Sequence, residues 1–351
     1  MTLMNMNLEK KVVRARAPLR LGLAGGGTDV SPYSDEFGGL VLNATINRYA
    51  YATIASRQDN TIELVAADNA VCWSGTAVNS LPVMKGLELH AGVYNRVVRD
   101  YNSNKPLAIQ VTTHSEAPPG SGLGSSSTLV VALLHAFVEY LQIPIGEYEI
   151  ANLAYDIERT DLALAGGKQD QYAAAFGGFN FMEFHQDRVI VNPLRIKQSV
   201  LAELESALVL FYTGVSRESA KIIQEQKDSM KSGNAVSVEA MHRVKQEAIR
   251  MKEAILRGDL ESFAESMRLS WESKKKMATS ISNANIDAIY DAAIAAGARA
   301  GKVSGAGGGG FMMFIVDPTK RPDVIRTLGQ FNGQTFTCNF SKHGAYSWRI
   351  Q

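Results

Sequence analysis

The pattern of apolar and polar positions divides the chain into two parts. In the first part, stretches rich in β-branched and aromatic residues alternate with a few segments of helical periodicity. Leu129, Leu133 and Phe137 belong to an apolar series at helical spacing, which predicts a helix over residues 125–141. The other elements expected here are strands at 12–17, 40–55, 61–66, 107–113, 179–184 and 188–194, and a helix at 150–164 that Gly166 and Gly167 end.

The second part opens with a continuous apolar strand and is then mainly helical. Strands and helices mixed without strict βαβ alternation favour an α+β fold in two domains. We place the domains at residues 1–197 and 198–351. The expected elements are strands at 208–212, 311–316, 335–340 and 345–350, and helices at 217–230, 236–256, 260–270, 286–296 and 321–331.

Composition narrows the class of protein. The 351 residues carry a formal net charge of +1, so no long-range field is available to gather nucleic acid or an anionic membrane. No run of about 18 apolar residues and no signal-peptide pattern is found. Cys72 and Cys338 cannot form a disulfide framework, and no Cys/His spacing indicates zinc. We therefore expect a cytoplasmic enzyme.

The strongest chemical signal is a glycine- and serine-rich segment at 118–127, with the sequence PPGSGLGSSS. It lies between a predicted strand and the predicted helix 125–141. Glycine lets backbone N–H groups approach a ligand closely, and the first turn of a helix offers N–H donors with partial positive charge. The segment therefore predicts a site for a di- or triphosphate. The alternative is a capped helix after a flexible turn, which needs fewer glycines and serines.

Two better-known nucleotide motifs do not fit this segment. The chain contains no GxxxxGK[ST] pattern, so the segment is not a Walker A loop. Gly120-Ser121-Gly122 begins like a dinucleotide fingerprint, but Ser125 stands where the third glycine would be. A dinucleotide-dependent oxidoreductase is therefore not favoured.

Two further glycine-rich segments flank this one along the chain. Residues 17–29 read APLRLGLAGGGTD, a strand that runs into three glycines and then a Thr-Asp pair. Residues 304–310 read SGAGGGG and lie between a predicted helix and a predicted strand. Close approach of backbone to a ligand would explain both segments. A β-turn with a self-capping Asp explains the first as well, and a hinge or simple turn explains the second.

Taken in chain order, the segments 17–29, 118–127 and 304–310 resemble the three signature motifs of the GHMP kinase superfamily. Within it, residues 25–29, 38–43 (GGLVLN) and 166–172 (GGKQDQY) most resemble the bacterial D-glycero-D-manno-heptose 7-phosphate kinases, while L-fucokinases share the Gly-Gly-x-Thr-Asp element. The resemblance implies a two-domain α+β fold, with a ribosomal-protein-S5-like N-terminal domain and a ferredoxin-like C-terminal domain. It also implies ATP-dependent phosphorylation of the C1 hydroxyl of a heptose 7-phosphate, to give the 1,7-bisphosphate used to make nucleotide-activated heptose.

The resemblance assigns ATP and Mg²⁺ as cofactors. Ser126 and Glu158 match the Mg²⁺ ligands of the family, in keeping with a hard cation that needs only one or two protein oxygens. The sequence alone favours a solvated helix residue at Glu158, paired with Arg159 or Lys168, and only the family pattern reverses this interpretation. The residues matched to ATP binding are Pro119, Gly120, Ser121, Gly122, Leu123, Gly124, Ser125, Ser126 and Ser127.

The resemblance also assigns catalytic and sugar-binding positions. Asp170 matches the catalytic aspartate, which accepts or orients the substrate hydroxyl, and Arg20 matches the basic residue of the first strand. From the sequence alone, Asp170 could instead cap the helix that begins near Gln171. Asp29 matches the sugar-hydroxyl ligand. The full set matched to substrate binding is Gly27, Thr28, Asp29, Lys168, Gly305 and Gly307.

A heptose 7-phosphate requires a second cationic site for its phosphate. Lys168, Arg48, Lys302 and Arg217 are candidates, and spacing does not choose among them. Gly25-Gly26-Gly27 replaces the Gly-Glu-His of galactokinases, which argues against galactose as the substrate. The expected partner is a small-molecule sugar phosphate, with no nucleic acid and no membrane, and a homodimer is left open.

Two other functions compete with this one. An L-fucokinase or another hexose-1-kinase would use the same motifs. A sensor of this fold would bind sugar or nucleotide without transfer, but it would not need Ser126, Glu158, Asp170 and Arg20 together. A heptose 7-phosphate kinase and an L-fucokinase or other hexose-1-kinase differ in whether turnover depends on a phosphate group on the substrate.

Overall fold

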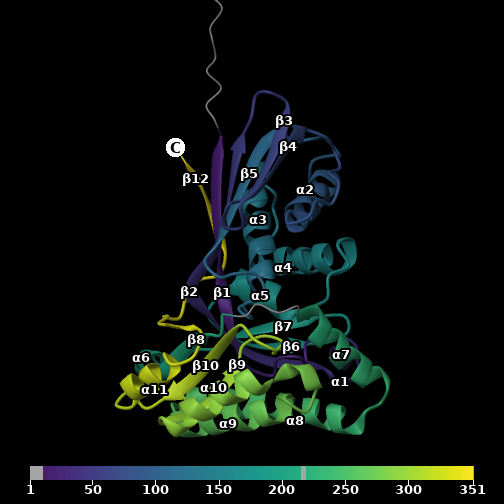
Figure 1. Ribbon diagram of the computed structural model, residues 1–351. Coiled ribbons are helices and arrows are strands. Elements are labelled where there is room, and N and C mark those ends of the chain that lie inside the picture. Colours follow the sequence, from purple (N-terminus) through teal and green to yellow (C-terminus); the bar gives the residue numbers. More distant parts are fainter. Residues whose placement is uncertain (1–10, 215–218, 351) are drawn as a thin grey trace, which may run out of the picture.

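The computed structural model describes residues 11–214 and 219–350, and it has an α+β architecture as the sequence predicts (Figure 1). The strands are β1 (Val12–Ala24), β2 (Gly39–Ser56), β3 (Thr61–Ala66), β4 (Val71–Thr76), β5 (Ile109–Ser115), β6 (Phe179–Phe184), β7 (Val189–Pro193), β8 (Leu208–Tyr212), β9 (Ala298–Val303), β10 (Phe311–Val316), β11 (Gln334–Phe336) and β12 (Tyr346–Ile350). The helices are α1 (Tyr33–Phe37), α2 (Glu88–Tyr101), α3 (Ser125–Leu141), α4 (Glu147–Asp156), α5 (Gln169–Phe176), α6 (Gln198–Ala207), α7 (Ser219–Lys231), α8 (Ala235–Arg257), α9 (Leu260–Lys274), α10 (Ala284–Ala295) and α11 (Arg321–Leu328).

The two long strands β1 and β2 run side by side through the middle of the molecule (Figure 1). Their sheet has the order β12-β1-β2-β5-β3-β4, and β6 extends it by pairing with β2 and β7. All pairings are antiparallel except that of β3 with β5. β1 is longer than the predicted strand 12–17, because the pairing continues past Pro18 with an irregularity between Pro18 and Arg20.

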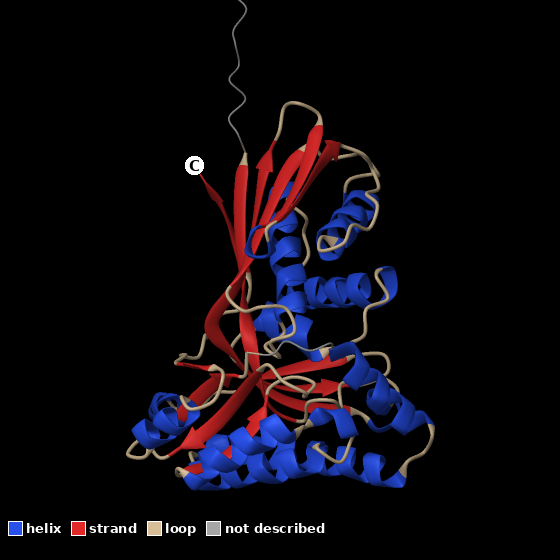
Figure 2. Cartoon of the chain, in the orientation of Figure 1, coloured by secondary structure: helices blue, strands red, loops and turns tan. Residues whose placement is uncertain are grey.

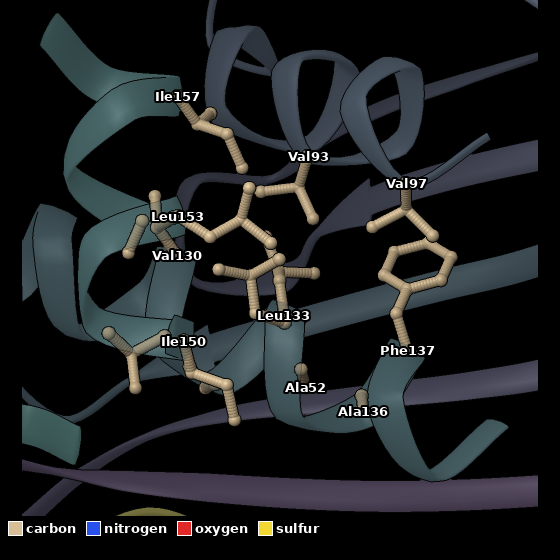
Figure 3. Close-up of a cluster of buried hydrophobic side chains, with 14 of the residues drawn as sticks. Ala52, Val93, Val97, Val130, Leu133, Ala136, Phe137, Ile150, Leu153 and Ile157 are labelled. Carbon is tan, nitrogen blue, oxygen red and sulfur yellow. The ribbon is translucent and has the colours of Figure 1, made fainter. Parts of the chain in front are cut away.

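The first hydrophobic core lies between this sheet and helices α2, α3 and α4, which cover one of its faces (Figure 2). The apolar series at helical spacing on α3 points into the core, with Leu133 and Phe137 almost fully buried. Figure 3 shows these side chains meeting Val93 and Val97 from α2 and Ile150 and Leu153 from α4 above Ala52 of β2. The periodicity of α3 therefore fixes the position of that helix on the sheet, and with it the position of its first turn.

The second sheet has the order β11-β8-β10-β9. Taken from β8 to β11, the chain order is strand, helices, strand, strand, helix and strand, which is the ferredoxin-like arrangement. Helices α8 and α9 lie beneath it at the base of the molecule (Figure 1). A shared core joins the two sheets, because Leu19, Leu21 and Leu23 of β1 pack in one cluster with Met251 of α8 and Met267 of α9.

The chain ends in the sheet where it began. β12 pairs antiparallel with β1, from Val12 opposite Ile350 to Arg16 opposite Tyr346. The last strand therefore belongs to the first sheet, although the sequence analysis assigns residues 198–351 to the second domain. That division stays a prediction, and the predicted junction near residue 197 is followed by α6.

The structure contains several elements that the sequence analysis does not predict. They are helices α1, α2 and α6 and strands β4 and β9. The expected helix 150–164 is shorter: α4 ends at Asp156 and continues as a π-helical turn, Ile157–Asp161. Such turns are rare and often occur at functional sites. The first two positions of the expected helix 217–230 lie outside the described residues, and the rest corresponds to α7.

The core packing of α3 yields a stability prediction. Leu133→Ala should lower the free energy of unfolding by about 2–5 kcal/mol, because the side chain is fully buried and its removal leaves a cavity. Leu256→Ala is the matched control, since Leu256 of α8 is 43% exposed, and it should change the free energy by less than about 1 kcal/mol. Urea unfolding followed by circular dichroism measures both variants. Equal effects would contradict the assignment of α3 to the core.

Candidate functional site

The glycine- and serine-rich segment forms a loop that ends at the N-terminus of α3. Gly124 occupies the N-cap position with φ 75° and ψ 22°, and it supplies no side-chain cap. The 17-residue helix behind it directs the positive end of its dipole toward the loop. Gly120, Gly122, Gly124 and Ser125–Ser127 line a cavity of about 280 Å³. Of the predicted ATP-binding residues, these six face the cavity, whereas Pro119, Ser121 and Leu123 do not line it, and Ser121 and Leu123 are buried.

The cavity lies where the two halves of the molecule meet. Its walls come from the segment after β1, the turn after α4, the N-terminus of α5, helices α7 and α9, and the loop between β9 and β10. Of the predicted substrate-binding residues, Gly27, Asp29 and Gly305 line it, and Thr28, Lys168 and Gly307 do not. Among the described residues, no cluster of three or more His, Cys, Asp or Glu side chains could hold a metal ion.

Arg20 and Asp170 form an ion pair beside the phosphate loop. The Arg20 Nε and Nη2 atoms lie 2.7 and 2.6 Å from Asp170 Oδ1, and the arginine is 3% exposed. Asp170 Oδ2 lies 3.2 Å from the position that a Cβ would take on Gly124, so this oxygen is beside the loop. Asp170 lies in the first turn of α5 and not at its N-cap, which is Lys168.

Arg20 also holds the loop itself. Its backbone N–H donates to the carbonyl of Leu123 at 3.1 Å, and its Nη1 donates to the carbonyl of Gly122 at 2.5 Å. One arginine on the first strand thus connects β1, the phosphate loop and α5. The sequence gives no indication of the two contacts with the loop.

Glu158 lies in the π-helical turn and is 2% exposed, so it is not a solvated helix residue. Its Oε1 accepts a hydrogen bond from Ser127 Oγ at 3.0 Å, and its Oε2 accepts one from Gln171 Nε2 at 2.5 Å. Arg159 Nη1 lies 3.6 Å from Oε1. Burial raises the pKa of the Glu158 carboxyl. The neighbouring Ser126 is exposed and lines the cavity together with Glu158.

Asp29 is 1% exposed and lies at the end of the glycine segment after β1. Its two oxygens accept from the backbone and the side chain of Gln169, both at 3.1 Å, and Oδ1 accepts also from Gly27 N–H at 3.1 Å. Burial, and secondly the charge of Asp170, raise the pKa of the Asp29 carboxyl. These bonds fix its direction toward the cavity.

Thr28 has a different place in the structure. Its hydroxyl donates to the carbonyl of Gly25 at 2.8 Å and accepts from Leu40 N–H at 3.0 Å, and the residue is fully buried. These contacts join the glycine segment to the start of β2. Thr28 therefore holds the loop that carries Asp29, and its own contact with a substrate stays a prediction.

The third glycine segment closes against the phosphate loop. Ser304 Oγ donates to the Gly122 carbonyl at 2.9 Å, and Phe311 N–H donates to the Ser121 carbonyl at 2.8 Å. A Cβ on Gly122 would lie 2.3 Å from Ser304 O, and one on Gly305 would lie 2.8 Å from the Gly122 Cα. Glycine is required at both positions because the two backbones touch. Gly307 packs against Ile281, away from the cavity.

Of the four candidate cations for a distal phosphate, the three that the structure describes do not line the cavity. Lys168 Nζ donates to the His185 carbonyl at 3.0 Å and lies 3.5 Å from Asp35 Oδ1. Lys302 is 2% exposed, and its Nζ donates to the carbonyls of Gly22 and Leu23. The Arg48 guanidinium lies over the Phe336 ring. Arg217 lies outside the described residues.

Sequence reasoning missed two buried polar residues that line the cavity from the second half of the chain. Lys274, the last residue of α9, is 3% exposed, and Gln226 of α7 is also 3% exposed, with no partner for its Nε2. The signal for Lys274 is its phase: Met267, Trp271 and Lys274 follow helical spacing on the buried face of α9. A lysine on a buried stripe is unusual and indicates a special environment. Gln226 carries no comparable signal.

Comparisons with known proteins agree with this geometry. The family described as GHMP kinases N terminal domain matches residues 88–178, and GHMP kinases C terminal matches residues 251–334. The chain is 50% identical, over 97% of its length and 100% of the relative, to the D-glycero-alpha-D-manno-heptose 7-phosphate kinase of Campylobacter jejuni. It is 26% identical over 91% of its length to 36% of the L-fucokinase/L-fucose-1-P guanylyltransferase of Bacteroides fragilis.

A solved structure gives the same result. The D-glycero-D-manno-heptose 1-phosphate kinase of Bacteroides thetaiotaomicron superposes with a TM-score of 0.83 and 48% identity, over 97% of this chain and 99% of the other. The fold and the comparisons together define a two-domain phosphotransferase that uses ATP. This chain belongs to the GHMP kinase family. No helix in the described ranges has the length and apolar character to span a membrane.

The packing of Gly167 against Asp29 yields a prediction. A Cβ on Gly167 would lie 2.0 Å from Asp29 Oδ2, so Gly167→Ala should displace the carboxylate from its bonds with Gln169. Loss of a hydrogen bond to a charged group costs about 1.5–3 kcal/mol, so we expect KM for the acceptor to rise roughly 10- to 100-fold. Steady-state kinetics measure this rise.

Gly329→Ala is the matched control for this variant. Gly329 caps α11 with φ −65°, and the nearest atom to its Cβ position is 3.4 Å away. An unchanged KM in Gly167→Ala would show that the carboxylate direction does not matter for the acceptor.

Proposed function

We propose that this kinase transfers the γ-phosphoryl group of ATP to the C1 hydroxyl of D-glycero-D-manno-heptose 7-phosphate, giving the 1,7-bisphosphate. The observation that carries the proposal is the 50% identity, over nearly the whole of both chains, to the Campylobacter jejuni heptose 7-phosphate kinase. The names of the two relatives put the existing phosphate at different positions, C7 in one and C1 in the other. Product analysis must therefore decide the acceptor position.

The phosphate loop supports the nucleotide half of this function. Residues 119–127 wrap the phosphates of ATP, because glycine backbone and the first turn of α3 present N–H groups to the cavity. The γ-phosphoryl group then lies toward Asp170, whose Oδ2 is beside Gly124. Phosphoryl transfer needs mainly positioning and neutralisation of charge, which this arrangement offers.

Asp170 supports the proton transfer. As the C1 oxygen bonds to the γ-phosphorus, the bond from that phosphorus to the bridging oxygen of ADP breaks, and the hydroxyl proton passes to Asp170. Arg20 contacts Asp170 through Oδ1, which leaves Oδ2 for the hydroxyl. The cation also offsets negative charge on the transferring group. Arg20 thus orients the base.

The residues near the loop fit a magnesium ion. Ser126 offers an exposed hydroxyl and Glu158 a buried carboxylate in the same cavity wall, and both are hard oxygen donors of the kind Mg²⁺ takes while keeping several waters. Ser127 and Gln171 hold the carboxylate in place. When bound, the ion would neutralise charge on the nucleotide phosphates.

Three buried side chains support recognition of the sugar. Asp29 accepts hydrogen bonds from sugar hydroxyl groups. Gln169 and Gln226 line the same cavity, and Gln169 Oε1 and Gln226 Nε2 are buried atoms without a hydrogen-bond partner among the described residues. A buried polar atom without a partner is costly, so a sugar hydroxyl bonded there gains specificity as well as affinity. Gly27 and Gly305 line the same cavity.

L-fucose kinase activity is the second candidate, supported by the 26% identity to the Bacteroides fragilis enzyme. An ADP-release screen with heptose 7-phosphate, free heptose, fucose, galactose and mevalonate separates the two. We expect turnover of heptose 7-phosphate at least tenfold above that of any other acceptor. Phosphorus NMR of the product should show a new phosphate on C1. Preference for fucose would overturn the proposal.

Asp170→Asn tests the base. We expect kcat to fall by about 10²–10⁴-fold, because the amide cannot accept the hydroxyl proton, while ATP binding stays nearly intact. Asp291→Asn, on the exposed face of α10, is the control and should keep wild-type kcat. Steady-state kinetics and titration with a fluorescent ATP analogue give the two readouts. An active Asp170→Asn enzyme would remove the base assignment.

Glu158→Gln tests the magnesium site. Replacement of the carboxylate by an isosteric amide removes the charged ligand, so the Mg²⁺ concentration for half-maximal rate should rise about tenfold or more. Rates measured over a series of Mg²⁺ concentrations at fixed ATP check this expectation. An unchanged Mg²⁺ titration would contradict the role of Glu158.

A further inference from the structure

Lys274 is a buried cation that the proposed mechanism does not yet use. It ends α9 and lines the cavity while being 3% exposed. Its Nζ donates a hydrogen bond to the Gly305 carbonyl at 2.6 Å. Lys274 forms no ion pair with a carboxylate of the described residues. An ammonium group has three N–H donors, and the Gly305 carbonyl accepts from only one of them. Burial of a charged group with incomplete hydrogen bonding is costly unless a ligand completes the site.

The position of Lys274 relates it to the reacting groups. Its Nζ lies 3.5 Å from the Cβ position of Gly26, in the glycine segment that carries Asp29. Its bonding partner Gly305 touches the backbone of Gly122, the residue whose carbonyl accepts from Arg20. Lys274, from the second half of the chain, therefore lies next to the segment that contacts the phosphate loop at Gly122. Arg20, from the first half of the chain, contacts the same residue directly.

The electrostatic surroundings support the same placement. Asp29, Arg20 and Asp170 all act on the Lys274 ammonium, and burial lowers the pKa of Lys274 to about 8. Lys302 of β9 is a further cation on that side, but both of its described bonds go to the β1 backbone. Of these two lysines, Lys274 is the one that lines the cavity, together with Asp170.

We propose that Lys274 is a further catalytic residue, which donates hydrogen bonds from its ammonium group to the oxygens of the transferring phosphoryl group. This inference rests on the proposed kinase function. Arg20 and Lys274 then stabilise the negative charge of the transition state from opposite sides. The bond to Gly305 makes the cation part of the third glycine segment, so correct docking of that segment on Gly122 also positions the charge.

The 7-phosphate of the sugar is the other phosphate that Lys274 could bind, and kinetics distinguish the two. Lys274→Met keeps the length and apolar stem of the side chain and removes its charge. If Lys274 contacts the transferring group, kcat should fall about 10²–10³-fold for heptose 7-phosphate and for free heptose alike, as for loss of a transition-state donor. KM for either sugar should change less than about threefold.

Other outcomes overturn the inference. A KM increase confined to heptose 7-phosphate, with kcat kept, would assign Lys274 to the distal phosphate. Unchanged kcat and KM would leave it no part in turnover. Lys276→Met is the matched control, because Lys276 is exposed just beyond the same helix, and it should keep wild-type kinetics. Thermal unfolding and binding of a fluorescent ATP analogue establish that Lys274→Met is folded, and Lys274→Arg, which keeps a charge, should recover part of kcat.

The pH profile gives a readout that a purely structural role would not move. The ammonium form is present below the pKa of Lys274 and is lost as pH rises through about 8, so kcat/KM of the wild type should fall above that pH. The groups that face Lys274 are Arg20, Asp29, Asp170 and Lys302. Lys274→Arg should move the alkaline limb upward by more than about one pH unit, because arginine stays charged. An unmoved limb would contradict the inference.

Failure of the proposed function is recognised separately. The acceptor screen on the wild type identifies the sugar, and the Lys274 variants are then assayed with the sugar that is turned over. If no sugar is turned over, slow hydrolysis of ATP without acceptor replaces the assay. In that case an equal hydrolysis rate in the wild type and Lys274→Met would overturn the role of Lys274 independently.

Discussion

Arg20 is the residue on which the geometry of the site depends. Its backbone and side chain contact Leu123, Gly122 and Asp170, so it fixes the phosphate loop and the candidate base relative to β1. A guanidinium can do this because its planar set of donors serves several acceptors at once. Arg20 is buried and Asp170 is partly exposed, so removal of the aspartate would leave a buried charge without its partner.

The rest of the site is arranged around backbone contact between two glycine segments. Gly122 and Gly305 approach so closely that neither can carry a side chain, and Ser304 and Phe311 add hydrogen bonds across the junction. The cavity beside this junction holds Asp29, Glu158 and Lys274, all of which are almost fully buried. Because water does not screen these groups, Lys274 would interact strongly with a phosphate, and the two carboxyl groups would interact strongly with a cation or a hydroxyl donor.

Long strands explain how these groups come together. β1 supplies Arg20 and leads to Asp29, and its apolar side chains pack on α8 and α9 of the second half. β12 returns to pair with β1, and α3 is fixed on the sheet by its apolar face. The two halves thus share a sheet and a hydrophobic core. This shared packing holds the phosphate loop, Asp29 and Lys274 in fixed positions relative to one another.

The sequence by itself determined the α+β class, most strands, the helix after the phosphate loop, and the kinase family, because periodicity and glycine spacing are local properties. It also marked Arg20, Asp29, Glu158 and Asp170, through motifs. It missed α2, β9, Gln226 and Lys274. Only the tertiary structure decided that Lys274 lines the cavity whereas Lys168 and Lys302 do not. Which cation meets a ligand depends on long-range packing and burial, and residue spacing carries no record of either.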